Sequence, residues 1–249
     1  MFRNLLFFVF AICSIGANAQ QSQDYYENVE IKNLQIPEDA LSFFVLGDWG
    51  RNVDFNQQQV ADRMAETAYK VEPEFFISTG DNFYSNGVAS VNDPMWQTSF
   101  ENVYYHGTLF EYWYVVLGNH DYRGNPQAEI DYTGVSQRWK MPSRYYSFEQ
   151  ELEDESGEQA LFVFIDTSPF EKEYHQEEKY KNVVGQDTTT QKIWLEQTLS
   201  KSNAKWKIVI GHHPLYTTGK RFGEKNDMVP AFQPLFEKYH SCPKRLGFG

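Results

Sequence analysis

Positive charge is scarce in this chain of 249 residues. It has 22 Lys and Arg against 34 Asp and Glu, for a formal net charge of −12. Proteins that bind nucleic acid gather Lys and Arg on one face to displace counterions from the phosphates, so this composition excludes nucleic acid as a partner. If the protein handles anions, the local positive charge has to come from another source, and a metal ion is the simplest one.

A long hydrophobic run is also absent. The first twenty residues carry Arg3, an apolar run over 5–15 and the small triplet Ala-Asn-Ala at 17–19, which is the pattern of a cleavable signal peptide. A membrane-spanning helix needs about 18 or more apolar residues, and this run does not reach that length. We therefore expect a signal peptide over 1–19, a secreted or periplasmic protein, and no stable membrane anchor after cleavage.

Cysteine is scarcer still, with two in the whole chain. Cys13 lies in the predicted signal peptide, so only Cys242 remains in the exported protein, and no disulfide can close within it. Stability then has to come from core packing or from metals. The chain has the material for a core, because 41% of its residues are hydrophobic and 17% are aromatic. The same composition excludes a disordered chain.

Short apolar runs alternate with helical patterns along the chain. The runs, rich in β-branched and aromatic residues and typical of buried strands, cover 41–46, 75–77, 112–117 and 206–210. Amphipathic helices are predicted to begin at Asp54, Asp93 and Thr188, and a fourth to cover 231–239. At Asp54 and Thr188, a Gln three positions later predicts a capping box. Strands that alternate with helices predict an α/β domain with a largely parallel central sheet.

Two acidic segments interrupt this pattern. The segment 151–158 lies between apolar runs at 145–148 and 161–165, which predicts a β-hairpin with a hydrated tip. The second acidic segment covers 171–181. For both, a hydrated loop is a simpler interpretation than an acidic binding site.

A glycine and then a polar side chain follow each of the four alternating runs. These pairs are Gly47-Asp48, Gly80-Asp81, Gly118-Asn119 and Gly211-His212. Ligands of open α/β sheets bind at the carboxyl ends of the strands, and a glycine there permits the sharp turn that aims the next side chain into the crevice. Two carboxylates, an amide oxygen and an imidazole form a set of metal ligands. We therefore predict a metal site at this edge of the sheet.

Three more residues extend the predicted site. Tyr84, three residues past Asp81, can fold back to the same metal if the turn is tight, or it can pack on its own loop. A phenolate ligand favours ferric iron over zinc, because the metal has to displace the phenol proton. His120 directly follows Asn119 and points elsewhere, which suits a proton donor to a departing alkoxide. His213 is interpreted as a structural or supporting residue.

The order and spacing of these motifs carry a family resemblance. Asp48 is followed by GDNFY at 80–84, GNHD at 118–121 and VIGHHP at 209–214, as in the calcineurin-like metallophosphoesterases. More narrowly, the chain resembles the small tartrate-resistant purple acid phosphatases, since most other members lack the tyrosine of the Asp-x-x-Tyr motif. The resemblance covers about 41–239. It implies an α/β sandwich of two mixed sheets flanked by helices.

The resemblance also implies a dinuclear metal centre, with a ferric ion and a divalent Fe, Zn or Mn ion. The ligands carried over by motif are Asp48 and Tyr84 for the ferric ion, Asp81 as a bridge, and Asn119 and His212 for the divalent ion. A metal-bound hydroxide would attack the phosphorus of a small phosphate monoester, and His120 would protonate the leaving group. We therefore expect an exported acid phosphatase.

One family motif is missing. The family places a Gly-His-x-His motif near the end of the domain, whereas after His240 this chain reads SCPKRLGFG. We accordingly expect a leader over 20–40, a metallophosphoesterase domain over 41–240 that lacks its last strands, and an atypical tail over 241–249. Two alternatives stay open: a truncated, inactive pseudophosphatase or phosphate-binding remnant, and a phosphodiesterase or nucleotide hydrolase of the same fold.

Overall fold

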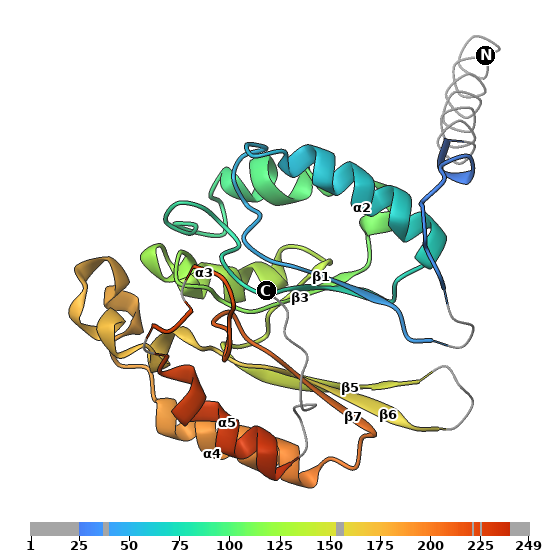
Figure 1. Ribbon diagram of the computed structural model, residues 1–249. Coiled ribbons are helices and arrows are strands. Elements are labelled where there is room, and N and C mark those ends of the chain that lie inside the picture. Colours follow the sequence, from blue (N-terminus) through green and yellow to red (C-terminus); the bar gives the residue numbers. More distant parts are fainter. Residues whose placement is uncertain (1–24, 37–39, 153–156, 221, 225, 240–249) are drawn as a thin grey trace, which may run out of the picture.

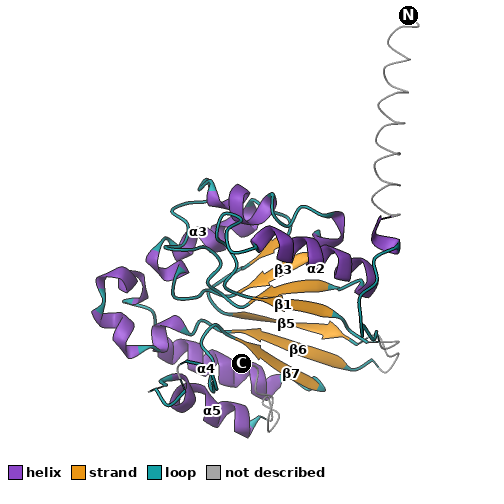
Figure 2. Cartoon of the chain, turned by 45° about the horizontal axis from the view of Figure 1, so that its top comes forward, coloured by secondary structure: helices purple, strands orange, loops and turns teal. Residues whose placement is uncertain are grey.

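The strands form two sheets that pack face to face between layers of helices (Figures 1 and 2). The computed structural model describes residues 25–36, 40–152, 157–220, 222–224 and 226–239. The predicted signal peptide over 1–19 and the predicted tail over 241–249 lie outside these residues.

The first sheet is parallel throughout. It contains, in spatial order, β1 (Phe43–Leu46), β2 (Phe75–Ser78), β3 (Tyr112–Val115) and β4 (Trp139–Lys140). β2 has a neighbour on each side and is buried along its whole length, which explains its unbroken apolar sequence. The helix α2 (Gln57–Val71) covers the outer face of this sheet (Figure 1), and α3 (Pro126–Asp131) follows β3 in the chain.

The second sheet is mixed. It contains β5 (Tyr146–Glu151), β6 (Gln159–Phe164) and β7 (Trp206–Ile210). β5 and β6 form the predicted hairpin, and β7 lies parallel to β6. The helices α4 (Thr188–Lys201) and α5 (Met228–Lys238) cover its outer face (Figure 2).

The predicted α/β class and the two-sheet arrangement are confirmed. The expectation that both sheets are mixed is wrong in one respect, because the first sheet is parallel throughout the described ranges. Its strands are joined by long helical crossovers, whereas the hairpin of β5 and β6 places an antiparallel pair in the second sheet.

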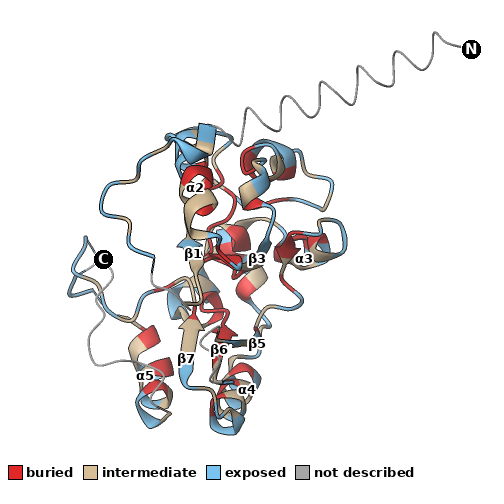
Figure 3. Cartoon of the chain, turned by 90° about the vertical axis from the view of Figure 1, so that its right-hand side faces the viewer, coloured by how far each residue is buried: buried red, intermediate tan, exposed pale blue. Residues whose placement is uncertain are grey.

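Aromatic rings join the two sheets. The ring of Phe75 on β2 meets those of Phe148 and Phe162 edge to face, with centroids 5.6 and 5.1 Å apart. The ring of Tyr114 on β3 stacks on Phe148 at 4.2 Å. Such geometries add favourable electrostatics to the burial of apolar area. A second, smaller core lies between the second sheet and α4 and α5, whose buried residues occupy only part of each helix (Figure 3).

The helix α2 begins differently from the predicted capping box at Asp54. Its first residue is Gln57, and the preceding Asn56 has a left-handed backbone with no side-chain cap. The Gln57 side-chain oxygen instead accepts hydrogen bonds from the backbone nitrogens of Arg51 at 3.2 Å and Val53 at 3.0 Å. Its Nε2 donates to the carbonyl oxygen of Ser99 at 2.8 Å. The glutamine therefore ties the loop before α2 to a distant segment, which is a tertiary role that a capping pattern does not reveal.

The helix α4 differs in the same way. Its cap is Asp187, whose Oδ1 accepts from two backbone amides of the first turn, both at 3.0 Å. Gln191, predicted to close the box from Thr188, bonds to the backbone of Asp166 through both its oxygen, at 2.9 Å, and its nitrogen, at 3.1 Å. It thereby ties α4 to the end of β6.

The remaining helices are short. A π-helix follows the predicted cap Asp93, whose Oδ1 accepts a hydrogen bond from Met95 N at 2.9 Å. The helix α5 begins at Met228, three residues before the predicted start. The π-helix covers Trp96–Glu101 and the 3-10 helices cover Gly107–Leu109, Asp121–Arg123, Tyr132–Gly134, Ser168–Phe170, Lys172–Gln176 and Glu178–Val183. Among the described residues, every helix is too short or too polar to cross a bilayer.

The described part of the predicted leader lies against α2. The Tyr25 hydroxyl donates to the Glu66 carboxylate at 2.7 Å, and the ring of Tyr26 stacks on Tyr69 with centroids 5.4 Å apart.

Asp166, just past β6, makes folding depend on pH. The residue is 1% exposed, the Tyr122 hydroxyl donates to its carboxylate, and its Oδ1 has no hydrogen-bond partner. Burial raises the pKa of Asp166 to about 7, although Tyr122 and Arg144 oppose the shift. Because this folded-state pKa lies above the unfolded value of about 3.9, the folded state holds the proton more tightly, and the Asp166 carboxyl lowers stability as pH rises from about 4 to 7.

We predict that Asp166→Asn, which keeps an acceptor for Tyr122, gains free energy of unfolding relative to the parent protein between pH 4 and 8. Chemical denaturation at a series of pH values measures this difference. Asp131→Asn, which changes an exposed carboxylate of α3, is the control and should follow the parent. A difference between Asp166→Asn and the parent that does not vary with pH would contradict the assignment.

Candidate metal centre

The loops that follow β1, β2, β3 and β7 meet at one edge of the two sheets (Figure 2). The backbone nitrogen of Asp48 donates to the carbonyl oxygen of Gly80 at 3.0 Å, which joins the first two loops. The His212 Nδ1 donates to the carbonyl oxygen of Thr79 at 3.0 Å, which joins the second sheet to the first. Parallel strands end at the same edge, so their following residues converge.

Asp81 lies at the centre of this cluster. It is 3% exposed and has a left-handed backbone, with φ of 51°. Its Oδ2 accepts from the Tyr84 hydroxyl at 2.8 Å, and its Oδ1 accepts from the backbone nitrogen of His120 at 2.7 Å. The Nε2 of His212 lies 3.5 Å from Oδ1. One buried carboxylate therefore touches three of the predicted motifs.

Tyr84 folds back into the site, as the tight-turn alternative requires. Its hydroxyl donates to the carboxylate of Asp48 as well as to that of Asp81. Burial and these two carboxylates raise the pKa of the Tyr84 phenol. On its other side, the guanidinium of Arg51 lies 3.4 Å from the centre of the Tyr84 ring, a cation–π contact. Arg51 belongs to no motif in the sequence, although it lies only three residues past Asp48.

Asn119 and His212 approach the centre from the opposite side. The Asn119 Oδ1 lies 3.3 Å from the His212 Nε2. The Asn119 Nδ2 donates to the Tyr180 hydroxyl at 3.1 Å, which turns the amide oxygen toward the site. Because the His212 Nδ1 donates to a backbone carbonyl, its Nε2 keeps a lone pair, as a metal-ligating imidazole requires.

The spacing of these donors fits metal ions. Ligands about 2.0–2.2 Å from an ion and at right angles lie about 3 Å apart. The Tyr84 hydroxyl and Asp81 Oδ2 are 2.8 Å apart, and the Asn119 Oδ1 and His212 Nε2 are 3.3 Å apart. Asp81 Oδ2 belongs to the first pair, and Asp81 Oδ1 lies 3.5 Å from His212 Nε2 of the second pair, which suits a carboxylate between two ions. Among the described residues, no three His, Cys, Asp or Glu side chains could hold a metal, so the donor set depends on Tyr84 and Asn119.

His120 lies beside the donor set and is oriented by its backbone surroundings. Its Nδ1 donates to the carbonyl oxygen of Ser85 at 2.6 Å, which leaves Nε2 facing the site, 3.9 Å from Asp81 Oδ2. Burial lowers the pKa of His120, although the Ser85 carbonyl and the Asp81 carboxylate oppose the shift.

A network of buried carboxylates holds the loops of the candidate site together. The Asp121 carboxylate accepts from the backbone nitrogens of Asn82 and Phe83, both at 3.1 Å, and of Gly118 at 2.8 Å. The Asn82 Nδ2 donates to the Glu129 carboxylate at 2.9 Å. Burial raises the pKa of both carboxyls. The network locks the GDNFY loop to the GNHD loop; sequence spacing gave no signal for Glu129, which lies outside both motifs.

The segment 171–181 is only partly the hydrated loop that its charge predicts. It forms two 3-10 helices, and Tyr180 within it is 4% exposed. The Tyr180 hydroxyl accepts from Asn119 Nδ2 and, at 2.8 Å, from the Arg123 guanidinium. The prediction was wrong for this tyrosine because a charge count does not register a single buried ring.

Residues 41–240 match the family described as calcineurin-like phosphoesterase. The chain belongs to this family. The fold implied by the motif resemblance is thus confirmed at the level of the family.

The relatives show which members of the family this chain is similar to. Purple acid phosphatase 7 of Arabidopsis thaliana is 37% identical over 80% of this chain and 61% of its own length. Tartrate-resistant acid phosphatase type 5 of Homo sapiens is 32% identical over 80% of this chain and 64% of its own length. The solved structure of GAP50, the anchor in the inner membrane complex of Plasmodium, aligns with a TM-score of 0.66 and 26% identity over 82% of this chain and 64% of that one.

These relatives agree with the predicted resemblance to the purple and tartrate-resistant acid phosphatases. The chain spans about three fifths of the length of the plant phosphatases that it matches, from 58% to 62%.

Gly118 sets how closely the GNHD loop approaches Asp81. A Cβ at Gly118 would overlap the backbone nitrogen and Oδ1 of Asp81, whereas a Cβ at Gly134 would meet nothing within 4 Å. We predict that Gly118→Ala lowers the free energy of unfolding by about 1–3 kcal/mol through overpacking, and that the matched change Gly134→Ala stays within about 0.5 kcal/mol. Denaturant unfolding of both variants checks this. Equal stability of the two variants would show that the loops separate easily.

Proposed function

We propose that this protein is a metal-dependent acid phosphatase that hydrolyses phosphate monoesters. The observation that carries the proposal is the convergence of four other donor residues, Asp48, Tyr84, Asn119 and His212, around the Asp81 carboxylate, with the Nε2 of His120 facing the same space. Family membership and relatives that are purple or tartrate-resistant acid phosphatases support it.

The other donor residues fall into two groups that Asp81 joins. We infer that Asp48 and Tyr84 hold a ferric ion, that Asn119 and His212 hold a divalent Fe, Zn or Mn ion, and that Asp81 bridges them. Two such ions supply Lewis-acid activation of water and neutralise the charge of the phosphoryl group. The chain needs this compensation, because its formal net charge of −12 repels phosphate esters.

The side chains around the donors orient the ester. The guanidiniums of Arg51 and Arg123 both lie close enough to His120 to lower its pKa, so they place positive charge beside the space where the phosphate would lie. The Ser85 carbonyl fixes the plane of the His120 ring. We infer that the Nε2 of His120, when protonated, gives its proton to the departing alcohol oxygen.

The first residues of the chain favour an exported protein. We infer that residues 1–19 direct export and are then removed, because they combine Arg3, a short apolar run and a small-residue cleavage triplet. The family match over 41–240 supports a single metallophosphoesterase domain after the leader at 20–40.

We predict that Asp81→Asn abolishes the binding of both metals, because an amide cannot supply two anionic oxygens to two cations. Elemental analysis and the visible spectrum of the purified protein measure this, with two metals per chain, one of them iron, and a purple band expected for the parent. Asp62→Asn on α2 is the control, since Asp62 bonds to His106 away from the site. Full metal content in Asp81→Asn would rule out the bridging role.

We predict that His120→Ala lowers turnover of p-nitrophenyl phosphate by about 100-fold or more, whereas its metal content and visible spectrum stay those of the parent. His106→Ala, which removes a histidine bonded to Tyr26 and Asp62 away from the site, is the matched control and should keep parental turnover. Unchanged turnover in His120→Ala would remove this residue from the reaction.

A further inference from the structure

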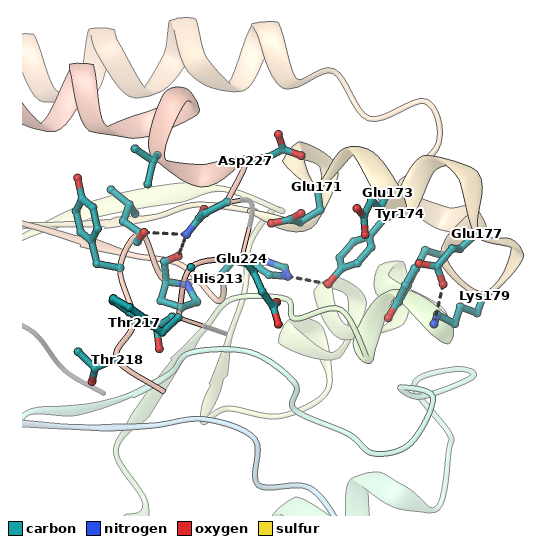
Figure 4. Close-up of a pocket in the computed structure, with 18 residues that line it drawn as sticks. Glu171, Glu173, Tyr174, Glu177, Lys179, His213, Thr217, Thr218, Glu224 and Asp227 are labelled. Carbon is teal, nitrogen blue, oxygen red and sulfur yellow. Dashed lines mark hydrogen bonds and ion pairs between the residues drawn. The ribbon is translucent and has the colours of Figure 1, made fainter. Parts of the chain in front are cut away.

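A cleft of about 1100 Å³ lies beside the candidate metal centre (Figure 4). One wall comes from the segment that contains the 3-10 helices Lys172–Gln176 and Glu178–Val183, and the other from the loop after β7 and the first residues of α5. None of the five proposed metal ligands lines it. Its volume suits a ligand larger than a phosphate group.

The cleft and the metal centre share a boundary. Tyr180 lines the cleft, and its hydroxyl accepts from the Asn119 side chain of the donor set at 3.1 Å. His213, which directly follows the proposed ligand His212, also lines the cleft and is 8% exposed. The His213 Nε2 and the Tyr174 hydroxyl are 3.1 Å apart, so this boundary is fixed by hydrogen bonds. An ester with its phosphate at the metal centre would place its alcohol part in this cleft.

Among the described residues of the lining, carboxylates outnumber cations. The carboxylates are Glu171, Glu173, Glu177, Glu224 and Asp227, and Lys179 is the cation among the described lining residues. Lys179 bonds to Glu177 at 2.7 Å, and Lys172 bonds to Asp227 at 3.1 Å. Glu173 and Glu224 are exposed and project from opposite walls (Figure 4).

Aromatic rings complete the lining. Tyr174 and Tyr180 lie on one wall, and Tyr216 and Phe222 lie on the other, both of these well exposed. Ring faces and carboxylates together are the chemistry that recognises ammonium and guanidinium groups. The carboxylates among these described residues also repel a second anionic group on the substrate.

We propose that this cleft selects phosphate monoesters whose alcohol part carries a positive charge. The inference rests on the proposed phosphatase function and adds the class of leaving group. In the hydrolysis, a water oxygen bonds to phosphorus as the ester P–O bond breaks. The electron pair of that bond stays on the alcohol oxygen, which takes a proton, so the products are a cationic alcohol and inorganic phosphate.

The overall negative charge of the chain attracts any cation, so the test has to separate the cleft from the rest of the surface. Glu173→Gln/Glu224→Gln removes two charges from the cleft. Glu111→Gln/Glu178→Gln removes two exposed charges that do not line it, and serves as the matched control. Neither pair lies among the proposed metal ligands or beside His120.

The substrates are matched in the same way. Phosphocholine is compared with its uncharged analogue 3,3-dimethylbutyl phosphate, and a phosphoserine peptide with flanking lysines is compared with the same peptide carrying acetyl-lysines. The metal-loaded parent protein should show a kcat/KM ratio of cationic to neutral substrate of about fivefold or more at low ionic strength. The cleft variant should bring the ratio close to one, and the control variant should keep it. A preference in only one pair of substrates identifies whether a small ester or a peptide is the source of the charge.

Equal kcat/KM for the cationic and neutral members of both pairs would overturn the inference, as would equal ratios in the cleft and control variants. Turnover of p-nitrophenyl phosphate by the parent and by the control variant, which should be the same in these two proteins, tests the phosphatase function separately. If the parent does not hydrolyse that ester, NMR titration with choline and with 3,3-dimethylbutanol still decides the inference, because the cleft should bind choline alone and lose it in Glu173→Gln/Glu224→Gln. Equal binding of the two alcohols would overturn it.

Discussion

The buried carboxylate of Asp81 is the constraint on which the site is built. A buried charge is costly unless hydrogen bonds or opposite charges compensate it. Here a backbone N–H, a phenol and an imidazole surround it, and each comes from a different part of the chain. Close approach is possible because a glycine, Gly118, faces it, where any Cβ would overlap it. The loops are therefore arranged around one carboxylate, and the donors of Tyr84, Asn119 and His212 follow from that arrangement.

Backbone strain accompanies this arrangement and is held by the core. Asp48 and Asp81 both have left-handed backbones, with φ of 60° and 51°, and non-glycine residues in that region cost about 1–3 kcal/mol each. Between β1 and α2, Trp49 is buried directly after Asp48, its Nε1 donates to Ser78 Oγ at 2.8 Å, and its ring packs on Phe83. The burial of these aromatic rings against the loops thus offsets the energetic cost of the two left-handed residues.

The sequence predicted the parts of this structure that depend on local pattern. The strands are visible as apolar runs because a parallel sheet buries both faces, and the strand-end rule brought Asp48, Asp81, Asn119 and His212 together without any knowledge of long-range contacts. The helix starts failed where a side chain had a tertiary partner: Gln57 and Gln191 match a capping pattern, yet each bonds to a distant segment.

Other features had no local signal. Arg51 became part of the site only through its stacking on Tyr84, and Tyr180 only through its bond to Asn119. Their roles depend on how loops pack, which neither periodicity nor charge encodes. The acidic character of 171–181 was visible, but the cleft that it helps to form needs a second wall from the loop after β7.

The bond between His212 and Thr79 joins residues 133 positions apart, and its consequence concerns the order of folding. Bringing distant positions together costs loop-closure entropy, and chains that depend on such contacts fold more slowly. The first sheet can assemble Asp48, Asp81 and Tyr84 from neighbouring strands, whereas His212 arrives only after the second sheet has docked. We therefore expect the half of the candidate centre that contains the histidine to be completed last, so that its formation reports the docking of the two layers rather than the collapse of either one.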